Sequence, residues 1–368
     1  MAMTDRFDLP VTAASAEAVA EYIAAVDLLL SANIGADARL ERAVAADPDF
    51  ALAQIARARL LQLQARIPEA RALAERAERL AKHSSARERR HVAMIACAIR
   101  GEAGTALSLV REHAAEFPQD ALPLSLALGV FGLLGFSGQR DHHEAQLALL
   151  EELAPYWPED WWFLGYLGWA RIETGAVTEG TRLVERSLML NPRNAHGAHQ
   201  RAHGFFEAGD AEGGAAFLMG WLPGYERAGH LHCHLSWHLA LFELARGNSR
   251  HAAAIYRDAI RPSVALSAPM LSLADSASFL WRWQIYEASP ALGAEWAEVT
   301  AHIRRHFPHA SLAFADVHAA LAEAAAGDDR ALQDRIAGLR DLAGAGRLPS
   351  GEVASASCAA VDALAQSR

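Results

Sequence analysis

The sequence has little of what marks secreted and membrane-spanning proteins. Its three cysteines, Cys97, Cys233 and Cys358, are far apart and odd in number, so they predict neither a paired metal motif nor a disulfide framework. That pattern indicates a reducing compartment. No apolar stretch reaches about 18 residues without a charge, and the first ten residues are polar, so we expect neither a transmembrane helix nor a signal peptide. A cytoplasmic protein without a membrane partner is predicted.

Positive charge is also scarce. The chain has 34 Lys and Arg residues against 44 Asp and Glu residues, a formal net charge of −10, and no long basic run. Nucleic acid is therefore not an expected partner. Val, Ile and Thr are thin while Ala and Leu dominate, a composition that favours helices over sheets.

The sequence contains glycine turns that recur between amphipathic segments. A glycine in the left-handed conformation ends a helix, and a following Asp, Asn or Ser can cap the next one. Gly175 and Gly209 are 34 residues apart, and Gly209 and Gly247 are 38 apart, close to the tetratricopeptide period of about 34. The same turn recurs at Gly101 and Gly327.

Loops that contain proline mark the boundaries between successive helix pairs. Pro48 follows a helix predicted over 36–45, and Pro192 follows one over 177–189; Pro118 and Pro158 mark further boundaries. We predict an all-α protein of tetratricopeptide-like helix-turn-helix repeats forming a right-handed superhelix. It would be a single α-solenoid domain over 1–368, with a lead-in over 1–15, repeats over about 16–343 and a frayed tail over 344–368. The alternative is a generic helical bundle.

Histidines concentrate in one short stretch. Seven of the 17 lie between His196 and His238, and they include the pairs His199/His203 and His234/His238. A spacing of four places both imidazoles of a pair on one helix face. If the two helices are the first helices of adjacent repeats, the four imidazoles converge.

Four imidazoles offer two kinds of chemistry. His199, His203, His234 and His238 could ligate a divalent transition metal, or they could act as general acids and bases without one. Neither pair is an HExxH motif, because Gln200 and Leu235 occupy the position of the glutamate. The alternative for any one of these histidines is a structural hydrogen bond between helices.

Acidic residues inside apolar helices are further candidates. Asp275 and Asp316 need partners, since an unpaired buried charge is costly. The alternatives are that Asp275 pairs with Arg282 and that Asp316 caps a helix. Glu173 lies near a predicted helix end, where a surface role is the simpler interpretation. The nine tryptophans are expected mainly in the core, although a ligand-facing aromatic wall is the alternative.

Several motifs together resemble the tetratricopeptide repeat protein 38 family, over roughly residues 20–330. The resemblance implies a tetratricopeptide-like superhelix with a shared set of His, Asp and Glu side chains, and it implies no particular reaction. Two departures stand out: animal members carry a His-Asp pair where this chain has Leu128-Gly129, and a further histidine where it has Phe205. The matching motifs are Arg87-Glu88-x-x-His91-Val92, Glu173-Thr174, His199-x-x-x-His203, Cys233-His234-x-x-Trp237-His238-x-Ala240-Leu241, Tyr256, Asp275-Ser276-x-Ser278-x-Leu280-x-Arg282 and Phe314-x-Asp316-x-His318.

Two functions follow from this interpretation. The first is a small-molecule enzyme or ligand-binding protein with a polar pocket inside the superhelix, suited to hydrolase, lyase or isomerase chemistry. Its expected catalytic residues are His199, His203, His234, His238, Asp275, Asp316 and His318, and its expected substrate-binding residues are Glu173, Trp237 and Arg282. The alternative is a scaffold that binds a protein or peptide partner in a concave groove, although the sequence has few lysines and no clear clamp for a peptide carboxylate. A homo-oligomer is compatible with either.

Overall fold

The computed structural model describes residues 3–287 and 292–366, and helices make up nearly all of their regular structure. In these residues the only strands are β1 (Met3–Thr4) and β2 (Pro10–Val11), which pair antiparallel. No helix in the described part is both long and apolar enough to cross a bilayer. The all-α prediction is confirmed. Contacts divide the chain into two compact units, residues 1–208 (unit 1) and 209–368 (unit 2).

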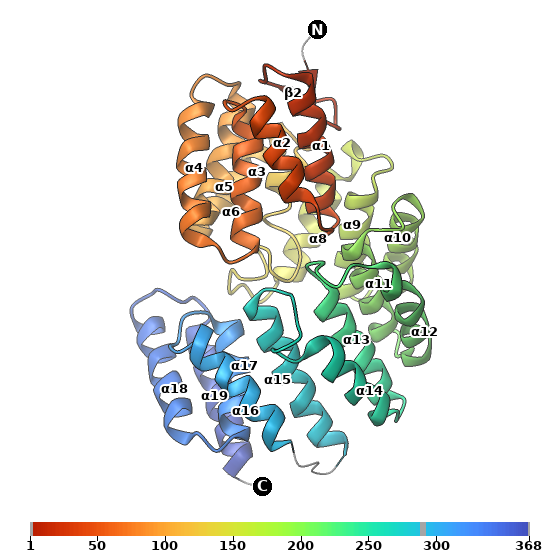
Figure 1. Ribbon diagram of the computed structural model, residues 1–368, viewed down its shortest axis with the longest axis vertical. Helices are drawn as coiled ribbons and strands as arrows, with labels where there is room; N and C mark the ends of the chain where they lie inside the picture. The colour runs from red at the N-terminus through yellow and green to blue at the C-terminus, as the bar shows by residue number, and fades with distance from the viewer. Residues whose placement is uncertain (1–2, 288–291, 367–368) are drawn as a thin grey trace. The chain divides into compact units, whose positions relative to one another are not determined.

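Most helices of unit 1 are joined by short turns that reverse the direction of the chain (Figure 1). The first helix of each pair packs on its own second helix, as in α1 with α2, α3 with α4, α5 with α6 and α9 with α10. First helices also contact one another, α1 with α3, α3 with α5 and α9 with α11. This is the packing of tetratricopeptide-like repeats. The helices are α1 (Ala16–Leu30), α2 (Ala36–Ala46), α3 (Ala51–Leu63), α4 (Ile67–Ala81), α5 (Ala86–Arg100), α6 (Ala103–Glu116), α7 (Ala121–Leu124), α8 (His142–Leu153), α9 (Trp161–Glu173), α10 (Val177–Leu190) and α11 (Ala195–Glu207).

Unit 2 repeats the same scheme. The first helices α13, α15, α17 and α19 contact one another in that order, and α14, α16 and α18 pack as second helices on α13, α15 and α17. That the two units continue one another as a single right-handed array stays a prediction. The helices are α12 (Ala211–Trp221), α13 (His232–Ala245), α14 (Ser249–Ile255), α15 (Pro269–Tyr286), α16 (Gly293–His306), α17 (Ala313–Ala325), α18 (Asp329–Gly344) and α19 (Gly351–Gln366), with a π-helical turn over Tyr256–Ile260.

The predicted glycine turns are where the pattern placed them. Gly101, Gly175, Gly209, Gly247 and Gly327 all have positive φ, which a residue with a side chain rarely adopts. The proline loops at Pro48 and Pro192 also hold, because α2 ends at Ala46 and α10 at Leu190. The local signals were therefore sufficient to place these helix ends.

The pair α9 and α10 shows how close these helices approach. A methyl group added at Gly168 would lie 2.6 Å from the carbonyl oxygen of Gly180, and one added at Gly180 would lie 2.3 Å from that of Gly168. Both distances are below any real contact, so the pair needs glycine at both positions. The neighbouring tryptophans Trp157, Trp162 and Trp169 are buried in the core, as expected.

One repeat departs from the scheme. After the single turn of α7, residues 125–141 run in turns and bends rather than in a helix. Gly129 in this segment has positive φ and its amide donates to the Gln146 side chain of α8 at 2.7 Å. A buried side chain of α8 therefore holds the irregular segment in place.

The prediction of a frayed C-terminal tail is wrong. Helix α19 packs on both α17 and α18, and Ala354 and Cys358 are buried with Leu332, Ile336 and Leu339. The tail was misjudged because its small residues look weakly hydrophobic, yet small residues are what a close helix contact requires.

Candidate functional site

Unit 1 joins a carboxylate and an imidazole from neighbouring first helices. Glu173 is the last residue of α9, and its Oε1 lies 2.7 Å from Nδ1 of His203 on α11. An ionised carboxylate can only accept a hydrogen bond, so Nδ1 of His203 carries the proton and Nε2 presents its lone pair. The Glu173 and His203 side chains are 14% and 19% exposed. The simpler surface role considered for Glu173 is not what these contacts show.

Two more imidazoles surround this dyad. His199 lies one turn before His203, and the two Nε2 atoms are 3.0 Å apart. His143 of α8 lies near the other oxygen of Glu173, with its Nε2 3.9 Å from Oε2. The Trp169 ring lies 5.9 Å from the His143 ring and 6.4 Å from the His203 ring.

These neighbours determine how Glu173 ionises. Burial raises its pKa, but the hydrogen bond from His203 and the charges of His203 and His143 lower it more, so the pKa lies below the ordinary value. Burial and the neighbouring His142 lower the pKa of His143. The arrangement therefore favours the ionised carboxylate at Glu173.

Unit 2 contains a second dyad of the same construction. Asp275 of α15 accepts a hydrogen bond from Nδ1 of His234 on α13 at 2.8 Å. Its other oxygen lies 3.5 Å from Sγ of Cys233. Burial, with the Asp275 charge, raises the pKa of Cys233 well above the ordinary value, so the thiol stays protonated and donates. Asp275 is 3% exposed and His234 is 14% exposed.

Aromatic rings lie around His234. The Trp237 ring stacks on it at 5.1 Å and 13°, and the His238 ring lies 4.8 Å away, one turn further along α13. Asp275 does not pair with Arg282, the alternative suggested by the sequence. Arg282 donates instead to the carbonyl of Ser278 at 3.1 Å, and its guanidinium lies 5.9 Å from the centre of the Trp237 ring.

The two remaining candidates from the sequence, His318 and Asp316, make different kinds of contact. Nδ1–H of His318 on α17 donates to the carbonyl oxygen of Phe314 at 2.7 Å. Burial lowers the pKa of His318 below its ordinary value, although the Asp275 charge opposes this effect. Asp316 has the capping role considered as its alternative: it accepts the backbone amides of Ser311 and Leu312 at 2.9 Å and pairs with Arg335 at 2.5 Å. Both oxygens of Asp316 are therefore engaged in structural contacts.

The four imidazoles that were predicted to converge belong to two pairs, one in each unit. His199 and His203 lie together in unit 1, and His234 and His238 lie together in unit 2. Each pair shares a helix face, as the spacing of four requires. Convergence of the two pairs stays a prediction, and so does the metal assigned to them.

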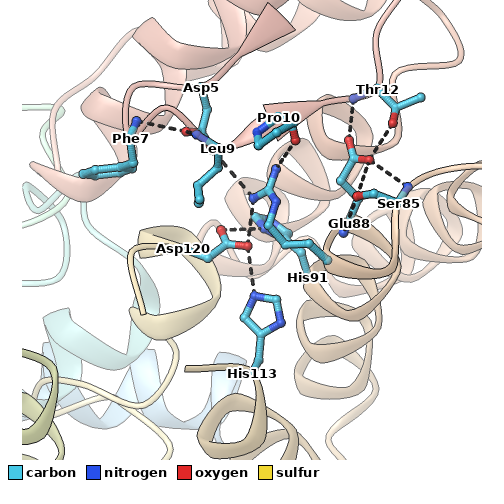
Figure 2. Close-up of polar contacts among 11 residues, drawn as sticks. Asp5, Phe7, Leu9, Pro10, Thr12, Ser85, Glu88, His91, His113 and Asp120 are labelled. Atoms are coloured by element: carbon cyan, nitrogen blue, oxygen red, sulfur yellow. Dashed lines mark hydrogen bonds and ion pairs between the residues drawn. The ribbon is translucent and has the colours of Figure 1, made fainter. Parts of the chain in front are cut away.

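A buried network in unit 1 was not among the sequence candidates. Asp120, just before α7, accepts Arg87 at 2.9 Å, His91 at 2.9 Å and His113 at 3.0 Å (Figure 2). Burial raises the pKa of Asp120, but the two imidazoles and Arg87 outweigh it and hold the pKa well below the usual range. All four side chains are buried.

The N-terminal segment closes this network. Arg87 also donates to the carbonyl of Pro10 at 2.8 Å, and Glu88 accepts the amide and hydroxyl of Thr12 at 2.7 and 2.6 Å (Figure 2). Ser85 and Glu88 form a capping box that starts α5 and positions both charged side chains. The spacing of Arg87 and His91 by four was the available signal, but nothing local indicates Asp120.

Comparison with known proteins does not assign the chain to a family. No family model matches the chain. Among solved structures, the chain is similar to the crystal structure of the P58(IPK) TPR domain, with 14% identity and a TM-score of 0.24 over 95% of this chain and 90% of that chain. The resemblance to the tetratricopeptide repeat protein 38 family therefore stays a prediction.

Proposed function

We propose that the chain binds a small-molecule ligand on the first helices of its repeats, and that His203 and His234 transfer protons there or ligate a divalent transition metal. The observation that supports this is one construction found in both units. A carboxylate on one first helix holds Nδ1 of a histidine on a neighbouring first helix, at 2.7 Å in unit 1 and 2.8 Å in unit 2. Each of these histidines has a second imidazole one turn away on its own helix.

The construction has a definite chemical consequence. A carboxylate on Nδ1–H fixes the tautomer and the ring orientation and makes Nε2 more basic. An imidazole prepared in this way accepts a proton near neutral pH, or it ligates a metal through Nε2. Hydrolase, lyase and isomerase reactions all use such a group.

Within unit 1 the spacing of the imidazoles suits a metal ion as well as a hydrogen bond. Two imidazole nitrogens about 2.0–2.1 Å from a tetrahedral zinc ion lie roughly 3.4 Å apart. The His199 and His203 Nε2 atoms are 3.0 Å apart, so a small rotation of either ring brings them to that spacing. Any metal would serve here as a Lewis acid, with Glu173 keeping His203 in the correct tautomer.

Titration with cobalt(II) and zinc tests the metal part of the proposal. We expect tight binding by the wild type, and binding at least tenfold weaker in His203→Gln and Glu173→Gln, since loss of a supporting carboxylate typically costs about 10–100-fold in affinity. His251→Gln is the matched control, because His251 on the second helix α14 also faces a carboxylate, Glu243, at 3.2 Å, but its side chain is 51% exposed. If the wild type binds neither ion, the metal part is wrong and only proton transfer remains.

The fold by itself supports a second candidate, a scaffold for a protein partner. Stacked helix pairs whose first helices contact one another form the extended surfaces that repeat proteins use for binding. A stoichiometric protein partner that binds His203→Gln and His234→Gln as well as it binds the wild type would favour this function over the first.

A further inference from the structure

Arg282 is the only lysine or arginine on the four first helices of unit 2. Helices α13, α15, α17 and α19 contain no other residue of this kind, whereas the second helices α14, α16 and α18 contain six. Arginines are expected on the second helices, but this one lies on α15, the helix that supplies Asp275 of the unit 2 dyad. Its place on a first helix therefore needs a specific explanation.

The guanidinium of Arg282 has no acidic partner. In the part of the chain that the structure describes, no carboxylate lies within ion-pair distance of it, whereas Arg304 on the second helix α16 pairs with Asp328 at 3.1 Å. Arg282 is exposed, and its Nη1 donates to the carbonyl of Ser278, one turn back on its own helix, at 3.1 Å. A guanidinium has five N–H donors in a planar fork. One hydrogen bond thus holds the group in place, and the other donors are available to a ligand.

One indole ring joins Arg282 to the unit 2 dyad. The guanidinium lies 5.9 Å from the centre of the Trp237 ring, a distance at which the ring face attracts a cation. The His234 ring stacks on the same indole at 5.1 Å and 13°, and Asp275 holds His234 at 2.8 Å. The guanidinium and the imidazole therefore lie within the length of one small molecule. Nε1 of Trp237 is also buried without an acceptor among the described residues, a cost that an acceptor atom would remove.

We infer that Arg282 binds an acidic group, a carboxylate or a phosphate, of the ligand at the unit 2 dyad. The planar fork of a guanidinium matches the oxygens of both groups. The polar groups without partners beside His234 are donors, the Arg282 fork and the Trp237 N–H. The acceptor, Asp275, is 3% exposed and already engaged by His234. An anionic ligand therefore fits this surface better than a cationic one.

The inference deepens the proposed function, because it gives the small-molecule ligand an acidic group. It rests on the proposed function for the statement that Arg282 and His234 serve one ligand. The contact between Arg282 and an anion needs neither a metal ion nor a proton transfer. It can therefore be tested separately from the chemistry of His234.

Calorimetric titration of the full chain with inorganic phosphate and with succinate, at low ionic strength, tests the contact and distinguishes a phosphate from a carboxylate ligand. We expect saturable binding of at least one anion by the wild type. Binding by Arg282→Gln should be at least about tenfold weaker, because hydrogen bonds between charged groups are lost. Arg282→Lys should keep only part of the affinity, since an ammonium lacks the planar fork.

Arg257→Gln is the matched control. Arg257 is also exposed and its guanidinium lies 6.0 Å from the centre of a tryptophan ring, that of Trp283, but it belongs to the π-helical turn. This variant should bind the anion within about twofold of the wild type, since it removes an exposed charge away from the dyad. The Arg282 variants should keep the Tm of the wild type, because Arg282 is exposed and bonds only to its own helix.

NMR of the histidine side chains tests whether the anion lies beside the dyad. The anion that binds should shift the ring signals of His234 and leave those of His251 in place, and Arg282→Gln should abolish the shift. The inference is overturned if the wild type binds neither anion saturably, if Arg282→Gln binds like the wild type, or if the bound anion leaves His234 unchanged. Cobalt binding should be nearly the same in Arg282→Gln and the wild type, so failure of the metal site and failure of the anion contact are distinguishable.

Discussion

Asp120 in unit 1 and Asp275 in unit 2 are both buried aspartates that accept a histidine, but they are neutralised differently. Asp120 has a guanidinium, two imidazoles and a covering N-terminal segment, so every oxygen is engaged and the charge is balanced. Asp275 has one imidazole and one thiol, and no arginine pairs with it within the described residues. The first arrangement resists change, while the second is the one at which we propose that a ligand binds. We therefore interpret the Asp120 network as structural and the Asp275 dyad as functional.

The largest effect should come from removing the guanidinium of the closed network. Arg87→Met leaves Asp120 buried with only imidazoles and detaches the Pro10 carbonyl, so the free energy of unfolding should fall by about 3–5 kcal/mol. Urea denaturation measures this. Arg90→Gln, which removes an exposed ion pair with Glu116, should cost less than about 1 kcal/mol. Equal losses in the two variants would contradict the structural role of the network.

Replacing Asp275 in the unit 2 dyad should reduce stability less than Arg87→Met does, but it should reduce ligand or metal binding more. Asp275→Asn keeps the size of the side chain but removes the charge that fixes His234, so stability should fall by about 1.5–3 kcal/mol. Where a metal binds, its affinity should fall by roughly 10–100-fold. Calorimetric metal titration beside urea denaturation separates the two effects. A variant as unstable as Arg87→Met would remove the distinction between the two aspartates.

The Glu173 dyad predicts a pH dependence of known sign. The folded pKa of Glu173 lies below its ordinary value of 4.5, so its contribution to stability is complete above about pH 4.5 and is lost as the pH falls through the folded pKa. The difference in unfolding free energy between wild type and Glu173→Gln should therefore shrink below about pH 4.5. Glu207→Gln, at an exposed position of α11, is the control. A difference that grows on acidification would show that the sign is wrong.

The smallest effect should come from the thiol of the unit 2 dyad. Cys233→Ala removes a weak donor 3.5 Å from Asp275 and leaves His234 in place, so we expect a loss of about 1 kcal/mol and unchanged metal or ligand binding. Thermal denaturation and the cobalt titration together check this. If binding is lost as completely as in Asp275→Asn, the Cys233 thiol takes part in binding together with Asp275 and His234.

Local signals explain what could be predicted from the sequence. A glycine turn such as Gly175 or a proline loop such as Pro192 acts on the residues beside it, so helix ends were predictable. The spacing of His199 and His203 also fixes a shared helix face without knowledge of the fold. The candidate histidines and carboxylates could therefore be named in advance.

What could not be predicted depends on contacts far apart in the sequence. Asp120 meets Arg87 across 33 residues, and the Pro10 carbonyl meets Arg87 across 77. Whether Asp275 pairs with Arg282 or with His234 depends on how α13 packs against α15, which the helical pattern does not contain. The C-terminal helix was missed for the same reason, since its small residues are buried only by their neighbours.

Nitrogen-15 NMR of the imidazole side chains tests the central claim most directly. If Glu173 and Asp275 hold the rings as described, His203 and His234 carry their proton on Nδ1 at neutral pH, and each tautomer changes when its own carboxylate is replaced by the amide. A wild type whose His203 and His234 carry the proton on Nε2 would contradict the account.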